Sequence, residues 1–173
     1  RAGIQVNAPA LARYAALCQE AGLVPIVEPG VLMDGDHTMQ RCGDVTEGVL
    51  RMVFGQLNRQ RVMLEGMLLK PNMALPGLAC PHQESVEKIA DATVNCFLRA
   101  VPAAVPGIAF LSGGQSAELA SARLNAMNVR FESRMPWGLA FPCSRALDRP
   151  ALEIGQGSAA RVPAGQKPLP RAA

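Results

Sequence analysis

A single lysine closes an apolar run, and this placement is the strongest chemical signal in the chain. Lys70 follows Met67-Leu68-Leu69 in the stretch LEGMLLKPNM and is followed by a proline. An amine attacks a carbonyl only in its neutral form, which burial at an apolar strand end or a neighbouring cation favours. The product of that attack would be a Schiff base. The plainer interpretation is a lysine whose aliphatic stem covers the core while its ammonium reaches water.

Other polar residues also follow apolar runs. Glu28 ends LVPIVE, and a carboxylate beside a Schiff-base lysine could move protons; alternatively it is a buried glutamate paired with a cation. Ser112-Gly113-Gly114 precedes a helical pattern, where glycines and free N–H groups suit an anion such as phosphate. Arg145 follows the next run and could complete a bidentate phosphate clamp. Taken singly, a short glycine turn and an exposed arginine are weak signals.

The elements that must position these residues alternate along the chain. The patterns predict helices over 8–21, 36–59, 84–100 and 116–128, and strands over 23–28, 62–69, 108–111 and 137–141, with Asp36 and Ser116 as N-caps and Gly22 as a C-cap. Such alternation implies right-handed crossovers and a parallel sheet, whose active groups gather at the carboxyl ends of the strands. Two α/β architectures fit: an open doubly wound sheet or part of a closed barrel.

Composition narrows the class of protein. The 173 residues suit one domain, with 49% hydrophobic residues for a core but only 4% aromatic ones. The net charge of +3 is too mild and too scattered to indicate a nucleic-acid partner. No apolar run is long enough for a transmembrane helix, and the first residues do not resemble a signal peptide. We expect a domain over 1–154 and a disordered tail rich in Gly, Pro and Ala over 155–173.

Neither a disulfide framework nor a metal site is expected. The five cysteines are odd in number and form no CxxC pair, which favours reduced thiols; they are Cys18, Cys42, Cys80, Cys96 and Cys143. His37 and His82 have no ligand partner at zinc spacing. Asp34 and Asp36 in MDGDH could suggest a metal, but a turn and a helix cap explain them better.

The segments LVPIVEP, LMDGDH, LEGMLLKPNM, VPAAVPGIAFLSGGQS, LNAMN, and PW followed by SRAL occur in this order between about residue 4 and residue 152. In order and spacing they closely resemble class I fructose-bisphosphate aldolase, the Schiff-base type. The resemblance implies a (β/α)₈ barrel (TIM barrel) that cleaves fructose 1,6-bisphosphate reversibly to dihydroxyacetone phosphate and glyceraldehyde 3-phosphate, without metal or cofactor. It implies that Lys70 forms the Schiff base, Glu28 transfers protons, Ser112 and Gly113 belong to the phosphate-binding turn, and Arg145 binds phosphate.

The resemblance also sets expectations for the whole molecule. It implies a cytoplasmic enzyme of glycolysis and gluconeogenesis that forms a homo-oligomer, as the tetrameric family does. Only the second half of the barrel, its fifth to eighth strands, is matched. The alternative function is a catalytically inactive, truncated aldolase-like protein that binds sugar phosphates or pairs with intact subunits. A different Schiff-base aldolase of the same barrel type is a third interpretation, which SGGQS together with LLKPNM disfavours.

Several positions depart from the pattern of the family. Gly30 stands where the family usually has a second glutamate, and PCSR stands where it has SYGR. Pro142 in that loop has no N–H to offer a phosphate, and Ser144 restricts a turn where the family has glycine. One extra residue lies between Asn128 and Trp137, and the C-terminal tyrosine of the family is absent.

Overall fold

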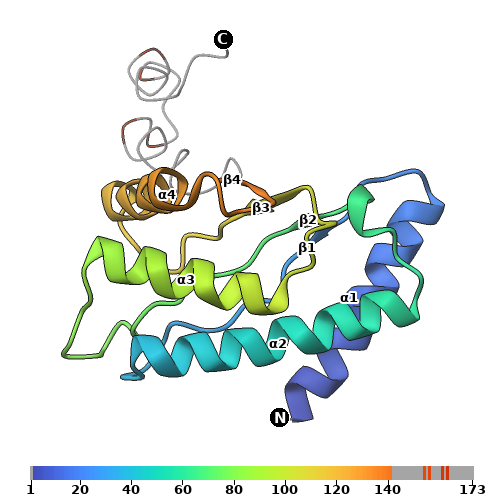
Figure 1. Ribbon diagram of the computed structural model, residues 1–173, viewed down its shortest axis with the longest axis horizontal. Coiled ribbons are helices and arrows are strands. Elements are labelled where there is room, and N and C mark those ends of the chain that lie inside the picture. The colour runs from blue at the N-terminus through green and yellow to red at the C-terminus, as the bar shows by residue number, and fades with distance from the viewer. Residues whose placement is uncertain (1, 142–153, 155, 157–160, 162, 164–173) are drawn as a thin grey trace.

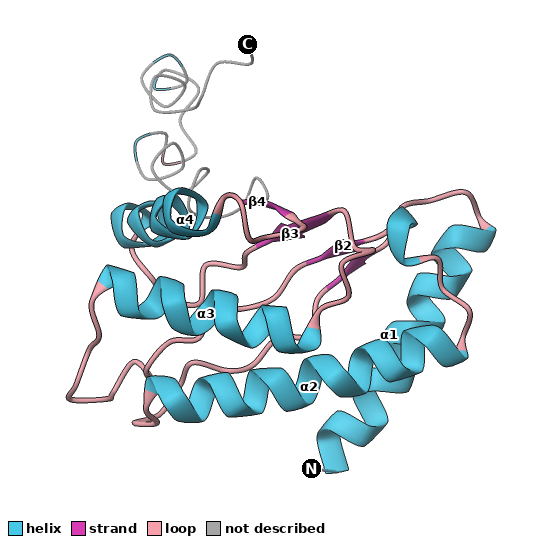
Figure 2. Cartoon of the chain, viewed as in Figure 1, coloured by secondary structure: helices cyan, strands magenta, loops and turns pink. Residues whose placement is uncertain are grey.

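The structure is a computed structural model that describes residues 2–141, 154, 156, 161 and 163. Helices and strands alternate along the described chain (Figures 1 and 2). The helices are α1 (Ala2–Glu20), α2 (Met39–Arg59), α3 (Val86–Ala100) and α4 (Ala117–Phe131), with a 3₁₀ turn η1 (Leu64–Gly66). The strands are β1 (Ile26–Val27), β2 (Leu68–Leu69), β3 (Gly107–Ala109) and β4 (Gly138–Ala140).

The four strands form one parallel sheet in chain order, β1-β2-β3-β4. Each helix packs on the next one along the chain, α1 on α2, α2 on α3 and α3 on α4. A doubly wound sheet would reverse its strand order at a switch point. The described strands show no reversal, so the doubly wound alternative is wrong and the winding is that of a β/α barrel. Within the described chain, β1 and β4 each have a neighbour on one side only, which leaves two open edges.

The strands are shorter than predicted, and the reason is visible at β1. The predicted 23–28 becomes Ile26–Val27, because Pro25 has no N–H and the ladder begins with its carbonyl, which accepts from Leu68 N at 3.0 Å. The other three predicted strands, 62–69, 108–111 and 137–141, were also too long. The first of them includes the 3₁₀ turn η1, and the sheet hydrogen bonds of β3 and β4 cover only three residues in each strand.

Helix boundaries also moved. The first helix starts at Ala2 rather than at residue 8, and it contains Pro9. Asp36 is not the cap of α2: Thr38 is, accepting from Arg41 N at 3.2 Å. Ser116 caps α4 as predicted, accepting from Leu119 N at 3.3 Å. The third and fourth helices were predicted over 84–100 and 116–128; α3 begins two residues later, and α4 runs on to Phe131.

The core lies between the sheet and the helices and is built mainly from aliphatic and methionine side chains. Its aromatic centre is Phe97 of α3 stacked on Phe110 beyond β3, with ring centroids 5.7 Å apart. Fully buried aliphatic and methionine side chains surround this pair, among them Leu50, Leu57, Met67, Leu69, Ile108 and Met127. This is the aromatic-poor core that the composition predicted.

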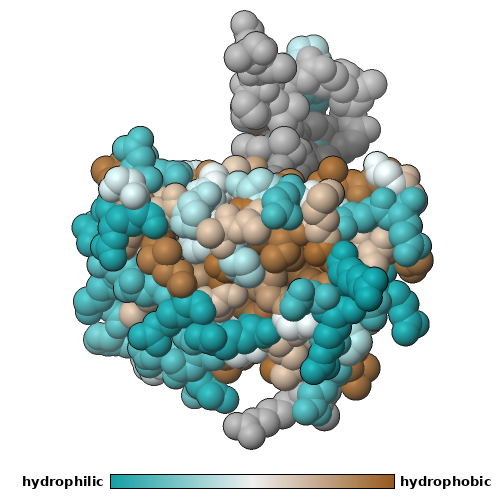
Figure 3. All heavy atoms as spheres, turned by 45° about the vertical axis from the view of Figure 1, so that its right-hand side comes forward, coloured by the Kyte–Doolittle hydropathy of each residue, from teal (hydrophilic) through white to brown (hydrophobic). Residues whose placement is uncertain are grey.

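Exposed apolar side chains are found on α1 and on the segment leading into the open edge at β1; they include Val6, Leu17, Leu23, Val24 and Ile26. Figure 3, in which the right-hand side of Figure 1 is turned forward, shows apolar side chains at the surface of this face. None of the described helices is long and apolar enough to cross a bilayer.

Candidate active site

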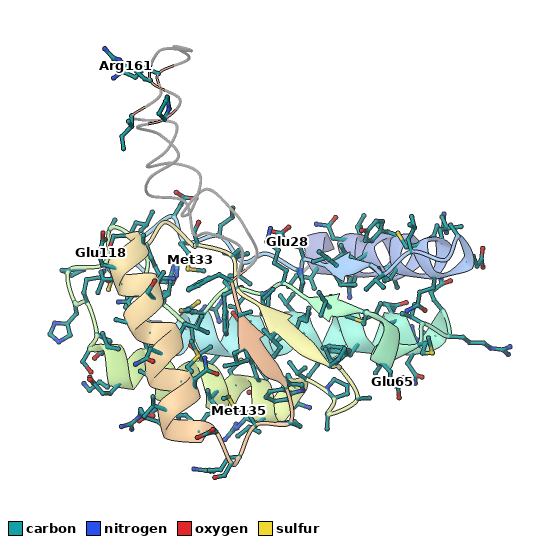
Figure 4. All side chains as sticks on the ribbon, turned by 90° about the horizontal axis from the view of Figure 1, so that it is seen from above. Glu28, Met33, Glu65, Glu118, Met135 and Arg161 are labelled. Atoms are coloured by element: carbon teal, nitrogen blue, oxygen red, sulfur yellow. The ribbon has the colours of Figure 1, made fainter. Side chains whose placement is uncertain are left out.

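The residues that follow β1 and β2 form the centre of the candidate site. Val27 pairs with Leu69 across the two strands, so Glu28 and Lys70 leave the sheet side by side. Lys70 N donates to Val27 O at 2.8 Å, and Lys70 Nζ donates to Glu28 Oε2 at 3.1 Å. The Lys70 side chain is 24% exposed and that of Glu28 is 46% exposed. Figure 4 shows Glu28 at the edge of the sheet next to α1. The structure therefore brings the two predicted catalytic residues into direct contact.

The described neighbour of the Lys70 amine is a carboxylate, not the cation that the sequence analysis considered. A protonated lysine is not a nucleophile, but Glu28 Oε2 lies within hydrogen-bond reach and can accept its proton. The neutral amine could then attack a carbonyl, and the protonated Glu28 could return the proton to a departing hydroxyl. The contact provides the geometry for the first of these transfers, from Lys70 to Glu28.

Asn72 holds the segments that follow β1 and β2 in place, and the sequence had not indicated this role. It is fully buried. Its Nδ2 donates to Thr46 Oγ1 of α2 at 2.9 Å and to Met73 O at 3.0 Å, and its Oδ1 accepts from Val31 N at 3.3 Å. One amide thus ties α2 to the segments that follow β1 and β2. The signal in the sequence was a lone amide directly after Lys70-Pro71 in an otherwise apolar stretch.

The predicted phosphate-binding turn lies at the end of the next strand. Gly113 and Gly114 have φ values of 57° and 77°, which glycine adopts without strain. Gln115 fixes the turn, because its N and its Nε2 both donate to Ser112 O, at 3.1 Å and 3.0 Å. The turn leads into α4 at the Ser116 cap, so helix N–H groups face the same region. The sheet places this turn one strand away from Lys70, as Leu111 N donating to Pro71 O at 3.1 Å shows.

A buried arginine beneath that turn was also missed. Arg123 of α4 is only 6% exposed, and its Nη1 donates to Gln115 Oε1 at 2.7 Å. Its Nε has no hydrogen-bond partner among the described residues. Burial lowers the pKa of this guanidinium from its ordinary value. Its place on this face was readable in the sequence, because Ala120, Arg123 and Met127 share the helical spacing of one face. The structure buries all three.

The remaining predicted residues divide into those that the structure describes and those outside it. Arg145, Pro142, Ser144 and Cys143 lie outside the described residues, as does most of the predicted tail. Gly30, in place of the second glutamate, follows Glu28 closely and donates to Glu28 O at 3.1 Å. Within the described part of the chain, no group of three or more His, Cys, Asp or Glu side chains could hold a metal ion.

The MDGDH segment is a turn that packs against another loop. Leu78 N donates to Met33 O and Ala79 N donates to Gly35 O, each at 2.9 Å. Gly77 N donates to His37 O at 2.8 Å. These contacts support the turn interpretation of Asp34 and Asp36 over a metal loop. Among the described cysteines, Cys18, Cys42, Cys80 and Cys96 are free thiols.

Comparison with known proteins gives a consistent result. The family model for class-I fructose-bisphosphate aldolase, a glycolytic family, matches residues 1–173. Fructose-bisphosphate aldolase B of Gallus gallus is 55% identical over 164 residues, 95% of this chain and 45% of that protein. A probable class 1 fructose-bisphosphate aldolase of Xanthomonas campestris is 52% identical over 151 residues, 87% of this chain and 45% of that protein.

A solved structure matches equally well. The fructose-bisphosphate aldolase of Plasmodium falciparum, crystallised with TRAP and a small-molecule inhibitor, superposes with a TM-score of 0.91 at 44% identity. The match covers 96% of this chain and 47% of that one. The chain therefore spans about half the length of the relatives that it matches.

Proposed function

The chain belongs to the class I fructose-bisphosphate aldolase family, and we propose that it carries Schiff-base aldolase chemistry at Lys70. The proposed reaction is the reversible cleavage of fructose 1,6-bisphosphate to dihydroxyacetone phosphate and glyceraldehyde 3-phosphate, in glycolysis and gluconeogenesis. The observation that carries the proposal is the contact of Lys70 Nζ with Glu28 Oε2 at 3.1 Å, at the carboxyl ends of adjacent parallel strands. Barrel enzymes of this kind place their reacting groups at that edge.

The first steps use this pair directly. Glu28 takes a proton from the Lys70 ammonium, and the free amine adds to the C2 ketone. A C–N bond forms while the C=O π bond opens, and one proton of the attacking nitrogen moves to the oxygen, which becomes a hydroxyl. Glu28 then returns its proton to that hydroxyl, which leaves as water, and a protonated iminium remains on Lys70.

Carbon–carbon cleavage follows from the iminium. The C3–C4 bond breaks, and its electron pair moves into the iminium to give an enamine. The C4 hydroxyl loses a proton and becomes the aldehyde of glyceraldehyde 3-phosphate. Protonation of the enamine at C3 and hydrolysis of the iminium release dihydroxyacetone phosphate and regenerate the amine. Every electron pair is accounted for without a redox partner.

The phosphate of the substrate is assigned to the turn at Ser112, Gly113 and Gly114, with Arg145 as a further ligand. The positive φ values of both glycines and the helix start at Ser116 support this assignment. We further propose that the chain corresponds to the fifth to eighth strands of the family barrel. Four strands in chain order and relatives about twice as long fit half of such a barrel, and the resemblance of the segments around Lys70 and Ser112 assigns it to the second half. A homo-oligomer in the cytoplasm, without a nucleic-acid or membrane partner, completes the proposal.

Borohydride trapping tests the proposed function. The folded chain is mixed with dihydroxyacetone phosphate and reduced, and its peptides are searched for an adduct by mass spectrometry. We expect the adduct on Lys70. Lys88 is an internal control, since its exposed ammonium is paired with Glu84 at 3.0 Å in the same kind of ion pair but lies on a helix surface. Lys70→Arg keeps the positive charge beside Glu28 but has no amine that can form a Schiff base.

The outcome separates the two functions. An adduct on Lys70 that is absent from Lys88 and from Lys70→Arg supports the lyase, and assay of fructose 1,6-bisphosphate cleavage follows. A folded chain that binds dihydroxyacetone phosphate without any adduct would contradict it. The inactive sugar-phosphate binder would then be the better description.

A further inference from the structure

Arg123 is a buried cation without a counter-charge in the described part of the molecule. Its side chain is almost wholly covered, yet none of the ion pairs among the described residues includes it. A single hydrogen bond, to the neutral carboxamide of Gln115, is its only polar contact among those residues, and Nε is left without a partner. Proteins rarely bury a charge in this way, because desolvation is costly unless an opposite charge repays it. The arrangement therefore calls for an anion.

Arg123 is linked through Gln115 to the turn at Ser112–Gly114. Long side chains on a helix point towards its N-terminus, and α4 begins just after the turn at Ser112–Gly114. Nη1 of Arg123 donates to Gln115 Oε1, and Nε2 of the same carboxamide donates to Ser112 O at 3.0 Å. The guanidinium thus polarises the Gln115 amide at Oε1 and makes Nε2 a stronger donor to the turn. Consecutive hydrogen bonds polarise one another in this manner.

Because Ser112 O is held at the end of this chain of hydrogen bonds, the orientation of the Gly113 N–H is fixed as well. In a trans peptide the carbonyl and the following N–H point in opposite directions. Ser112 O is held by two donors from Gln115, so the N–H of Gly113 is turned away from Gln115 and Arg123. No described residue accepts a hydrogen bond from that N–H. It is free to donate to a ligand.

We propose that Arg123 is a positioning residue for the phosphate group of the substrate: through Gln115 it locks the Ser112–Gly113 peptide and supplies buried positive charge behind it. This inference rests on the proposed function, because it takes the turn to be the phosphate site. Arg123 does not touch the substrate. It acts on the orientation and the donor strength of the Gly113 N–H, and it gains its missing counter-charge when the phosphate dianion binds.

The test compares a phosphorylated and an unphosphorylated ketone. Trapping on Lys70 is measured against the concentration of dihydroxyacetone phosphate and of dihydroxyacetone, for the unaltered chain, Arg123→Gln and Arg123→Lys. Arg130→Gln is the matched control: it removes the same charge from the same helix, but Arg130 is paired with Asp91 at 2.9 Å on the surface. All variants are checked for an intact fold by circular dichroism.

We expect Arg123→Gln to raise the half-saturating concentration of dihydroxyacetone phosphate about tenfold, the factor typical for loss of a charge-assisted interaction. The same variant should leave trapping of dihydroxyacetone unchanged, and Arg123→Lys should recover most of the loss. Arg130→Gln should change neither ketone. Equal shifts for both ketones, no shift at all, or equal behaviour of Arg123→Lys and Arg123→Gln would overturn the inference.

Two further measurements cover the remaining cases. If Arg123→Gln does not fold, Gln115→Leu removes the link and leaves the arginine in place; it should show the same phosphate-specific weakening, and an unchanged half-saturating concentration refutes the inference. If the unaltered chain traps neither ketone, the proposed function has failed. Titration with inorganic phosphate followed by ³¹P NMR then decides on Arg123 alone: weaker binding by Arg123→Gln supports its role, and equal binding rejects it.

Discussion

Replacement of Asn72 by leucine tests what holds the strand ends that carry Glu28 and Lys70 together. The buried amide of Asn72 donates from Nδ2 to Thr46 Oγ1 and Met73 O, and its Oδ1 accepts from Val31 N. Leucine has nearly the same size and shape but can make none of them. Asn72→Leu therefore removes the polar links between α2 and the segments after β1 and β2 while it leaves no cavity.

The magnitude follows from the three partners that are left behind. A buried donor or acceptor that loses its partner costs about 1 to 3 kcal/mol. Thr46 Oγ1 and Met73 O keep weak contacts with Cys42 Sγ, and Val31 N is only half-buried, so the three losses together cost about 5 kcal/mol rather than the upper limit. Burial of the leucine side chain returns about 2 kcal/mol. The free energy of unfolding should fall by about 3 kcal/mol, which lowers the midpoint of thermal unfolding by about 6 to 12 °C in a chain of this size.

Urea unfolding measures this loss, and two comparisons identify its cause. Thr46→Val removes only one of the three contacts and should cost less, and the double variant should cost less than the sum of the two single ones because they share a hydrogen bond. Asn95→Leu makes the same exchange at an exposed position of α3 and should lie within about 0.5 kcal/mol of the unaltered chain.

A loss below about 1 kcal/mol for Asn72→Leu, with an unchanged m-value, would refute this reasoning, since the loss of three hydrogen bonds at largely buried groups costs more. Strict additivity with Thr46→Val would refute it as well. In the folded variant we also expect a lower yield of the Lys70 adduct, because Asn72 lies two residues from Lys70 and holds the loop that follows Glu28.

Two further predictions concern glycine and cysteine. Gly77→Ala should lower the free energy of unfolding by about 2 kcal/mol or more, because a Cβ there would overlap the carbonyl oxygen of Gly35. Gly55 lies inside α2 with open space around it, so Gly55→Ala should raise the free energy of unfolding by about 0.5 to 1 kcal/mol. Urea unfolding of both variants checks these opposite signs. Burial raises the pKa of the Cys96 thiol from 9.0 to about 12. The unfolded chain therefore releases this proton first, and the free energy of unfolding should fall between about pH 9 and pH 12, by at most about 1.4 kcal/mol per pH unit for this thiol. Cys96→Ala should make that decline shallower, and a steeper or unchanged decline would count against burial as its cause.

The sequence predicted the order of the elements well because apolar runs, glycine and proline mark them directly. Lys70 and Glu28 could be singled out as candidates for the same reason, since each is the first charged residue after such a run. The lengths of the strands could not be predicted, because Pro25 and the turn η1 limit the ladder through hydrogen bonds between segments more than 40 residues apart. Arg123 was missed for a different reason. Helical period shows that it shares a face with buried residues, but it does not show that a charge can remain there.

The carboxylate beside Lys70 is compatible with amine chemistry, although the sequence predicted a cation or burial at this position. The proton count of Schiff-base formation explains this. The pair begins as an ammonium and a carboxylate and ends as a protonated iminium and a carboxylate, with one water released and no proton taken from solvent. The net charge of the pair is the same before and after, so the attraction between Glu28 and the nitrogen of Lys70 is retained in the product. Only the intermediate states are neutral, and they are formed by the transfer of one proton across a contact of 3.1 Å. In the proposed mechanism Glu28 therefore stabilises the resting ammonium and the iminium alike, and its contribution to the rate is the short path of that proton.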